Sequence, residues 1–413
     1  MSKPRIETWL AVVIGGIGLL LIAILGLFGY VSLTSTPLHP NARNVSSVTH
    51  SASAPKWADA VELGRQIVRA SLVEQNLPGL SVAVGADGDI VWAEGFGWAD
   101  LEKRVPVGPE MKFRIGTAST ALTSAAAGLL LQKGRLKLDE VIQAYVPAYP
   151  EKQWPVTLRQ VMGHVAGVPS DGGDEGELFS QHCDRPVDAL QHFARRSLRF
   201  EPGTEYRYSR YGWIVVSAAI EAAAHEPFLR FMREQIFEPA GMHDTKADPG
   251  PAPAPGQASA YFPRFAANPR YGPDPMRDLD YSCYAGSSVF VSTPADLVRY
   301  AIAIDRGTLI QPATVRLLQM PQRLRSGQET GYGLGWEVAT VALAGKDTRM
   351  VGHDGDSLGG TVASLMTFPE HGIVVAVTSN ISYANTSAVG SQVAQVFAVR
   401  GTSAARPAKA GSE

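Results

Sequence analysis

Segments with the pattern of β-strands lie near both ends of this 413-residue chain, and a helical stretch, residues 117–301, separates them. Residues 79–84 and 90–96 flank an Asp-Gly turn, which predicts a hairpin. Helical spacing predicts outer helices at residues 58–75 and 387–397. Four more strand-like runs follow the helical stretch: residues 335–343, 350–353, 361–368 and 373–379. The pattern predicts an α+β fold in which the N- and C-terminal segments share one antiparallel sheet beside a large helical region.

The N-terminus predicts a membrane anchor. Residues 10–33 are almost wholly apolar, which satisfies the roughly 20 residues that one membrane-spanning helix needs. A cleavable signal peptide has a shorter apolar region and a small-x-small exit, so the sequence favours an uncleaved anchor. Lys3 and Arg5 precede the run, and the next basic side chain is Arg43. The positive-inside rule therefore places residues 1–9 in the cytoplasm and the main domain in the periplasm or another extracytoplasmic space.

The rest of the chain divides by composition. Residues 34–56 are rich in Ser, Pro, Ala, Asn and Thr and predict a flexible stalk. Residues 57–399 predict one domain, and residues 400–413 a disordered tail. Several glycines in the anchor offer a close-packing face for a partner membrane helix, with ordinary membrane glycine as the alternative. They are Gly15, Gly16, Gly18, Gly26 and Gly29.

Composition excludes several classes of function. A formal net charge of −2 gives no electrostatic basis for binding nucleic acid. The nine histidines are scattered without metal-ligand spacing, and no dinucleotide or phosphate-loop pattern is present, so we expect no metal and no cofactor. The two cysteines, Cys183 and Cys283, form either a disulfide or two buried free thiols.

Three short motifs follow one another in the domain. Residues 113–120 read Phe-Arg-Ile-Gly-Thr-Ala-Ser-Thr and lead into a helical run, residues 121–132. Residues 202–213 contain Tyr-Ser-Arg after a Pro-Gly turn, and residues 352–357 read Gly-His-Asp-Gly-Asp-Ser. Acyl transfer by a hydroxyl requires a nucleophile, a base, an oxyanion hole and a substrate-orienting group.

In this order the motifs resemble those of the β-lactamase-related serine hydrolase family, which includes class C β-lactamases, D,D-peptidases and esterases. That family reads Ser-x-x-Lys, Tyr-Ser-Asn and His-x-Gly at these places. The resemblance covers about residues 57–399, and residues 145–152 and 379–382 resemble the membrane-tethered mitochondrial-type branch and its bacterial relatives. Other segments that resemble the family are residues 156–169, 237–245 and 284–297.

The resemblance implies a site whose catalysts have been replaced. Thr117 occupies the nucleophile position, and its methyl group restricts χ1 and crowds the attack. Thr120 occupies the lysine position and can supply neither a base nor a positive charge. Tyr208 matches the base, Arg210 replaces the asparagine, and His353 belongs to the third motif. Arg210 could replace the lost charge and keep Tyr208 acidic.

The backbone functions of the site survive these replacements. The resemblance implies an oxyanion hole made by the backbone N–H groups of Thr117 and Asp356. It also implies that a substrate lies as an added strand along His353, Asp354 and Gly355.

Three hypotheses follow. The first is a membrane-anchored pseudoenzyme that keeps the groove to bind a small acyl or peptide ligand. The second is a specialised acyl hydrolase that uses Thr117 with Tyr208 as base, with Ser119 as a less favoured alternative nucleophile. The third is a structural subunit of a membrane complex, recruited through the glycine-rich helix.

Overall fold

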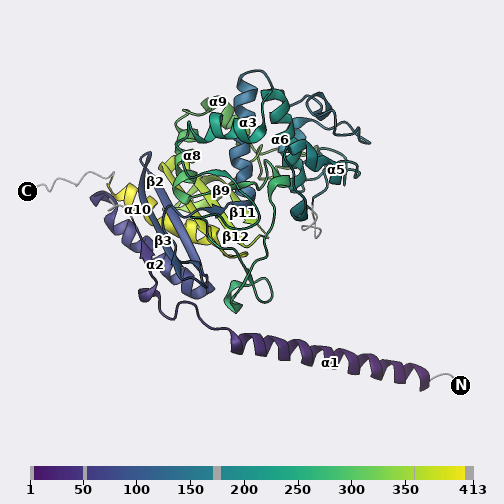
Figure 1. Cartoon of the computed structure of the whole chain (residues 1–413), viewed down its shortest axis with the longest axis vertical. Helices are drawn as coiled ribbons and strands as arrows, with labels where there is room; N and C mark the ends of the chain where they lie inside the picture. Colours follow the sequence, from purple (N-terminus) through teal and green to yellow (C-terminus); the bar gives the residue numbers. More distant parts are fainter. Residues whose placement is uncertain (1–3, 50–53, 171–177, 358, 405–413) are drawn as a thin grey trace, which may run out of the picture.

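One antiparallel sheet joins the two ends of the domain. The computed structural model describes residues 4–49, 54–170, 178–357 and 359–404. The strand order is β1-β3-β2-β13-β12-β11-β10, with β4 paired to β3, and Figure 1 shows purple and yellow strands side by side. The strands are β1 (Ser47–Val48), β2 (Gly79–Ala86), β3 (Asp89–Asp100), β4 (Val105–Pro106), β10 (Glu337–Leu343), β11 (Lys346–Ser357), β12 (Thr361–Phe368) and β13 (Ile373–Ser379).

Helices cover both faces of this sheet because its strands are apolar on both sides. Along β2, Val82 and Val84 belong to the cluster shared with α2 (Ala58–Gln75) and α10 (Thr386–Ala404). Ala83 points to the opposite face, in the cluster that contains α8 (Pro294–Asp305) and the helical region. This alternation follows from the two-residue period of a strand.

The helical region lies beyond the second face, with α3 and α6 at its centre (Figure 1). The described residues also form two smaller sheets, β5-β9-β6 and β7-β8. The helices of the helical region are α3 (Ser119–Gln132), α4 (Leu158–Met162), α5 (Leu190–Phe193), α6 (Arg210–Ala224), α7 (Phe228–Met232) and α9 (Pro312–Leu318). The short strands are β5 (Phe113–Arg114), β6 (Lys246–Ala247), β7 (Tyr261–Pro263), β8 (Pro273–Pro275) and β9 (Phe290–Ser292).

The shared sheet confirms the predicted α+β fold. Val82 of β2 lies opposite Val377 of β13 in the antiparallel register. The hairpin β2–β3 and the outer helix α2 occur where the sequence predicts them. The helix α10 runs to Ala404, so residues 400–404 of the predicted tail are helical, and residues 405–413 lie outside the described part.

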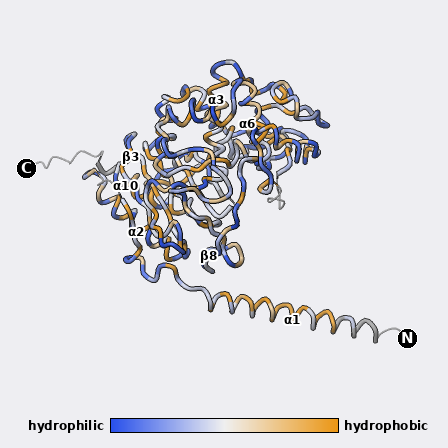
Figure 2. Tube along the Cα trace, in the orientation of Figure 1, coloured by the Kyte–Doolittle hydropathy of each residue, from blue (hydrophilic) through white to orange (hydrophobic). Residues whose placement is uncertain are grey.

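The apolar N-terminal run forms α1 (Pro4–Thr34). Its segment Val12–Thr34 is long and apolar enough to cross a membrane, and Figure 2 shows it as a hydrophobic helix that extends away from the domain. Residues 1–3 of the predicted cytoplasmic segment lie outside the described part.

The described part of the predicted stalk packs against the domain rather than forming a free linker. The Leu38 N–H donates to the Asn76 Oδ1 at 2.7 Å, and the buried His39 ring contacts the Leu77 carbonyl at 3.0 Å. Ser47 of β1 then pairs with Phe96 of β3. The reason is that β3 would otherwise leave an open edge, and a short added strand covers part of it.

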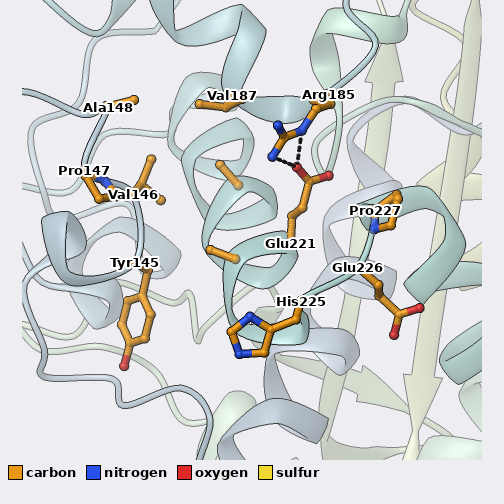
Figure 3. A pocket seen from close by; sticks show the side chains of 12 residues that line it. Tyr145, Val146, Pro147, Ala148, Arg185, Val187, Glu221, His225, Glu226 and Pro227 are labelled. Atoms are coloured by element: carbon orange, nitrogen blue, oxygen red, sulfur yellow. Dashed lines mark hydrogen bonds and ion pairs between the residues drawn. The ribbon is translucent and has the colours of Figure 1, made fainter.

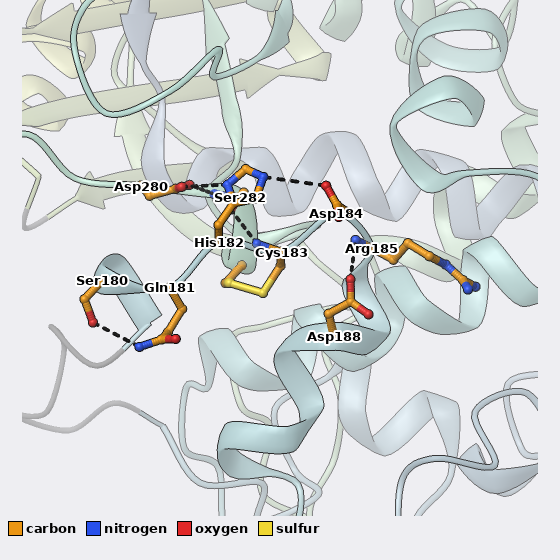
Figure 4. Close-up of a disulfide and its surroundings, with 10 residues drawn as sticks. Ser180, Gln181, His182, Cys183, Asp184, Arg185, Asp188, Asp280 and Ser282 are labelled. Atoms are coloured by element: carbon orange, nitrogen blue, oxygen red, sulfur yellow. Dashed lines mark hydrogen bonds and ion pairs between the residues drawn. A yellow bond between two sulfur atoms is a disulfide. The ribbon is translucent and has the colours of Figure 1, made fainter.

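The two cysteines form a disulfide, Cys183–Cys283 (Figure 4). It joins the segment that precedes the 3-10 helix Pro186–Ala189 to a second 3-10 helix, Ser282–Tyr284. The Cys183 N–H also donates to the Ser282 Oγ at 3.0 Å. Of the two alternatives that the sequence leaves open, the disulfide is the one observed.

Candidate active site

Thr117 lies in a 3-10 turn, Gly116–Ala118, between β5 and α3. This turn packs directly against β11. The contact is so close that a Cβ added at Gly355 would lie 2.0 Å from the Ile115 carbonyl oxygen. The Thr117 hydroxyl donates a hydrogen bond to the Asp354 carbonyl at 3.2 Å. The absence of a side chain at Gly355 therefore brings the first and third motifs into contact.

The second half of β11 has an edge that β10 does not cover. The β10–β11 pairing begins at Glu337 and Gly352, whereas β12 pairs with β11 as far as Ser357. The Asp354 N–H faces the Glu337 carboxyl closely enough to lower its pKa, and the Asp354 carbonyl accepts from Thr117. Both Asp354 backbone groups thus point away from β12, and the two-residue period directs the Asp356 N–H to the same edge. This geometry suits an oxyanion donor.

Tyr208 lies just before α6, where Ser209 caps the helix by accepting from the Gly212 N–H at 3.1 Å. The Ser209 N–H donates to the His164 Nδ1 at 3.0 Å, and the His164 ring lies 4.1 Å from the Tyr208 ring. Because Nδ1 accepts, the neutral His164 carries its proton on Nε2. His164 therefore supports Tyr208 by packing and by fixing the backbone after it.

His353 has both ring nitrogens engaged. Its Nδ1 lies 2.6 Å from the Asp354 carbonyl, which can only accept, so Nδ1 carries the proton. Its Nε2 consequently accepts from the Tyr332 hydroxyl at 2.9 Å. The His353 Nδ1 is also 3.8 Å from the Glu337 Oε1. The histidine therefore positions Tyr332 and the β11 edge, and it has no nitrogen left for Thr117.

Burial dominates the electrostatics of Tyr208. Desolvation raises its pKa to about 12, although the hydroxyls of Thr120 and Thr117 and the charge of Arg210 lower it. The Tyr208 hydroxyl is buried and makes no contact of full hydrogen-bond geometry in the described part of the chain. Arg210 is only partly buried at the start of α6. The expectation that Arg210 keeps Tyr208 acidic is therefore corrected: its charge acts in that direction, and burial outweighs it.

Burial also displaces the pKa values of the two histidines and of Glu337 in this site. Burial lowers the pKa of His353 to about 4 and holds the pKa of His164 well below its ordinary value, so both are neutral near pH 7. Burial raises the pKa of Glu337 to about 7, although the bond from the Asp354 N–H opposes the shift. Glu337 therefore titrates much closer to neutrality than an ordinary carboxyl group does.

The structure gathers the predicted residues into one cluster. Tyr208 and His353 have ring centroids 6.1 Å apart, and Thr117 contacts Asp354 of the same strand. Ser119 is fully buried at the first turn of α3, which does not suit a nucleophile. The side chain of Asp356 lies outside the described part.

The sequence did not identify three members of the cluster, His164, Tyr332 and Glu337. The family-like segment of residues 156–169 contains His164, and glycines flank Tyr332, which are signals that could have found both. No pattern in the sequence distinguishes Glu337.

The described residues contain no group of three His, Cys, Asp or Glu side chains arranged to hold a metal. A pocket of about 500 Å³ lies elsewhere, between α6 and the loop of residues 145–148, and shares no residue with the cluster (Figure 3). Its Arg185 and Glu221 pair with each other at 2.8 Å, so its charges are already compensated. We therefore assign the chemistry to the cluster rather than to this pocket.

The fold and the three converging motifs define a protein of the β-lactamase and penicillin-binding class. The family model described as Beta-lactamase matches residues 65–398, and the chain belongs to that family. It is 24% identical to the serine beta-lactamase-like protein LACTB, mitochondrial, of Mus musculus, over 91% of this chain and 89% of the relative.

Solved structures share the same fold. FmtA from Staphylococcus aureus superposes with a TM-score of 0.68 at 17% identity, covering 88% of this chain and 95% of that chain. A D-stereospecific amidohydrolase from Streptomyces sp. superposes with a TM-score of 0.67 at 20% identity, covering 81% of this chain and 98% of that chain.

Proposed function

We propose that this protein is a membrane-anchored, extracytoplasmic member of the family that has lost Ser-Lys catalysis and uses the retained site to bind a ligand. The anchor is α1, and the binding edge is the part of β11 that β10 leaves uncovered. Membrane attachment also allows a role as a subunit of a membrane complex, through the glycine-rich face of α1.

The observation that carries the proposal is that Thr117 meets no competent base among the residues that the structure describes. The Thr117 hydroxyl donates its hydrogen bond to the Asp354 carbonyl oxygen. A carbonyl oxygen is too weak a base to remove the proton. With a pKa of about 12, Tyr208 is a phenolate in a fraction on the order of 10⁻⁵ at pH 7. Both His353 nitrogens are occupied, and Thr120 has no basic group. A hydroxyl without a base attacks carbonyl groups very slowly.

Binding needs only groups that are retained. The Asp356 N–H faces the uncovered edge of β11, where an extended acyl or peptide ligand would add as a strand. Arg210 places a permanent cation beside Tyr208, close enough to lower its pKa. A positive charge at this place favours a ligand that carries an anionic group.

Covalent labelling and turnover of the full-length chain test the proposal. We expect no fluorophosphonate adduct, and hydrolysis of nitrocefin and p-nitrophenyl acetate at the rate of the Thr117→Ala control. The double variant Thr117→Ser, Thr120→Lys should still hydrolyse these substrates slowly, because Arg210 adds a second cation to the same site. Adding Arg210→Asn should raise the rate more than additively, since the three positions act as one unit.

One observation favours the alternative, an acyl hydrolase that uses Thr117. The Tyr208 hydroxyl lies beside the Thr117 and Thr120 hydroxyls, close enough for both to lower its pKa. Turnover above background that Thr117→Ala abolishes, or an adduct mapped to Thr117, would establish this alternative and overturn the first proposal.

A further inference from the structure

The end of α1 is attached to one loop of the domain, residues 264–272, which connects β7 to β8 and is named here the aromatic loop. The Phe28 ring lies 6.4 Å from the Phe265 ring and 5.9 Å from the Tyr271 ring. Phe265 and Tyr271 are themselves 5.6 Å apart. Figure 1 shows this part of the chain beside the domain end of α1. Three aromatic rings thus join the anchor to the domain.

Polar contacts fix the same attachment. The Ser35 hydroxyl donates to the Tyr271 carbonyl at 3.0 Å, and Arg264 donates to the Thr34 hydroxyl at 3.3 Å. The Asn76 amide, at the end of α2, donates to the Arg270 carbonyl at 3.4 Å. The aromatic loop is therefore held between the last turn of α1 and the body of the domain.

This attachment sets the depth of the aromatic loop relative to a bilayer. Phe28 lies within the apolar segment Val12–Thr34, six residues before its end. At 1.5 Å per residue, this places Phe28 about 9 Å along the helix from Thr34. A segment of this length just exceeds the roughly 30 Å hydrocarbon core, so its ends lie near the two interfaces. A loop in contact with Phe28 reaches the same depth.

We propose that the aromatic loop inserts into the lipid interface on the domain side of the membrane. Its surface suits that place, because Ala266 and Ala267 are exposed at its tip and Arg264 and Arg270 are exposed at its base. Aromatic side chains concentrate at the headgroup level, and arginines there attract anionic lipid. The inference rests on the membrane anchoring proposed above, and it adds a second contact that fixes the orientation of the domain on the bilayer.

Quenching by spin-labelled lipid tests this contact in the full-length chain. Both native cysteines are in the disulfide, so Ala267→Cys gives one site for a bimane label. The matched control is the exposed Lys133→Cys at the end of α3. In nanodiscs of phosphatidylcholine and phosphatidylglycerol with a shallow nitroxide lipid, we expect several-fold stronger quenching at 267 than at 133. Phe265→Ser with Tyr271→Ser should reduce the quenching at 267 towards the control.

Retention in the nanodisc, measured by flotation, separates the two proposals. A chain that floats but shows equal quenching at 267 and 133 overturns the aromatic-loop contact and leaves the anchor standing. A chain that does not float overturns the anchor, and the loop contact with it.

Discussion

At the scale of single residues, Tyr208 shows what a motif can and cannot predict. Its place in the chain matches the family base, and the structure brings it to Thr117 and His353 as expected. Its pKa depends instead on how tightly His164 and Tyr332 surround it, at 4.1 Å and 6.2 Å between ring centroids. Those two side chains come from distant segments, so the motif predicted where Tyr208 lies and not the direction in which its pKa is shifted.

Glu337 gives a prediction about pH. Its pKa is raised from 4.5 to about 7, so between these values the folded protein binds more protons than the unfolded chain. Stability contributed by Glu337 is therefore present at low pH and lost as pH rises through about 7. We expect the melting temperature of the native chain to fall relative to Glu337→Gln between about pH 5 and pH 8.

The comparison with Glu337→Gln is needed because His353 acts in the opposite sense. Its pKa is lowered to about 4, so its contribution to stability rises with pH up to about 6.5. Both chains keep His353, and the difference between them isolates Glu337. Parallel melting curves across the range would mean that Glu337 does not titrate in this environment.

At the scale of elements, the sequence predicted the long strands and helices well because their periodicity reports burial directly. β13 and α2 coincide with their predicted ranges. The short strand β1 was missed, since two residues carry no periodicity and their pairing depends on the open edge of β3. The resemblance implied that the Thr117 turn lies beside β11, but not how tightly the two pack, because that depends on Gly355 and a backbone neighbour, Ile115, far away in the chain.

That contact predicts the effect of Gly355→Ala. The added methyl group would lie 2.0 Å from the Ile115 carbonyl oxygen and 2.8 Å from the Ala118 nitrogen, and backbone must move to accept it. We expect a loss of about 1–3 kcal/mol in the free energy of unfolding, measured with denaturant. Gly401→Ala is the control, because its nearest neighbour would be Trp57 at 3.7 Å. Equal stability of the two variants would show that β11 and the turn are not in tight contact.

At the scale of the whole molecule, charge asymmetry around α1 predicts which side of the membrane the domain occupies. Lys3 and Arg5 precede the apolar segment, and the Cys183–Cys283 disulfide is compatible with an oxidising compartment. Protease added to intact spheroplasts should therefore digest the domain, with a cytoplasmic protein as the protected control. Protection of the domain until lysis would reverse the assigned orientation.

The pairing of β2 with β13 also governs when this protein can fold. Val82 meets Val377, so the centre of the sheet cannot close until almost the whole chain has been synthesised. Such distant partners make folding slow, because the entropy of closing a very long loop is lost before the contacts form. One edge of the apolar strand β2 pairs at once with β3, but the other edge waits unpaired while the rest of the chain emerges. A ribosome that stops before β13 releases a chain with an open, aggregation-prone strand edge, and that product depends on chaperones or proteases for its fate.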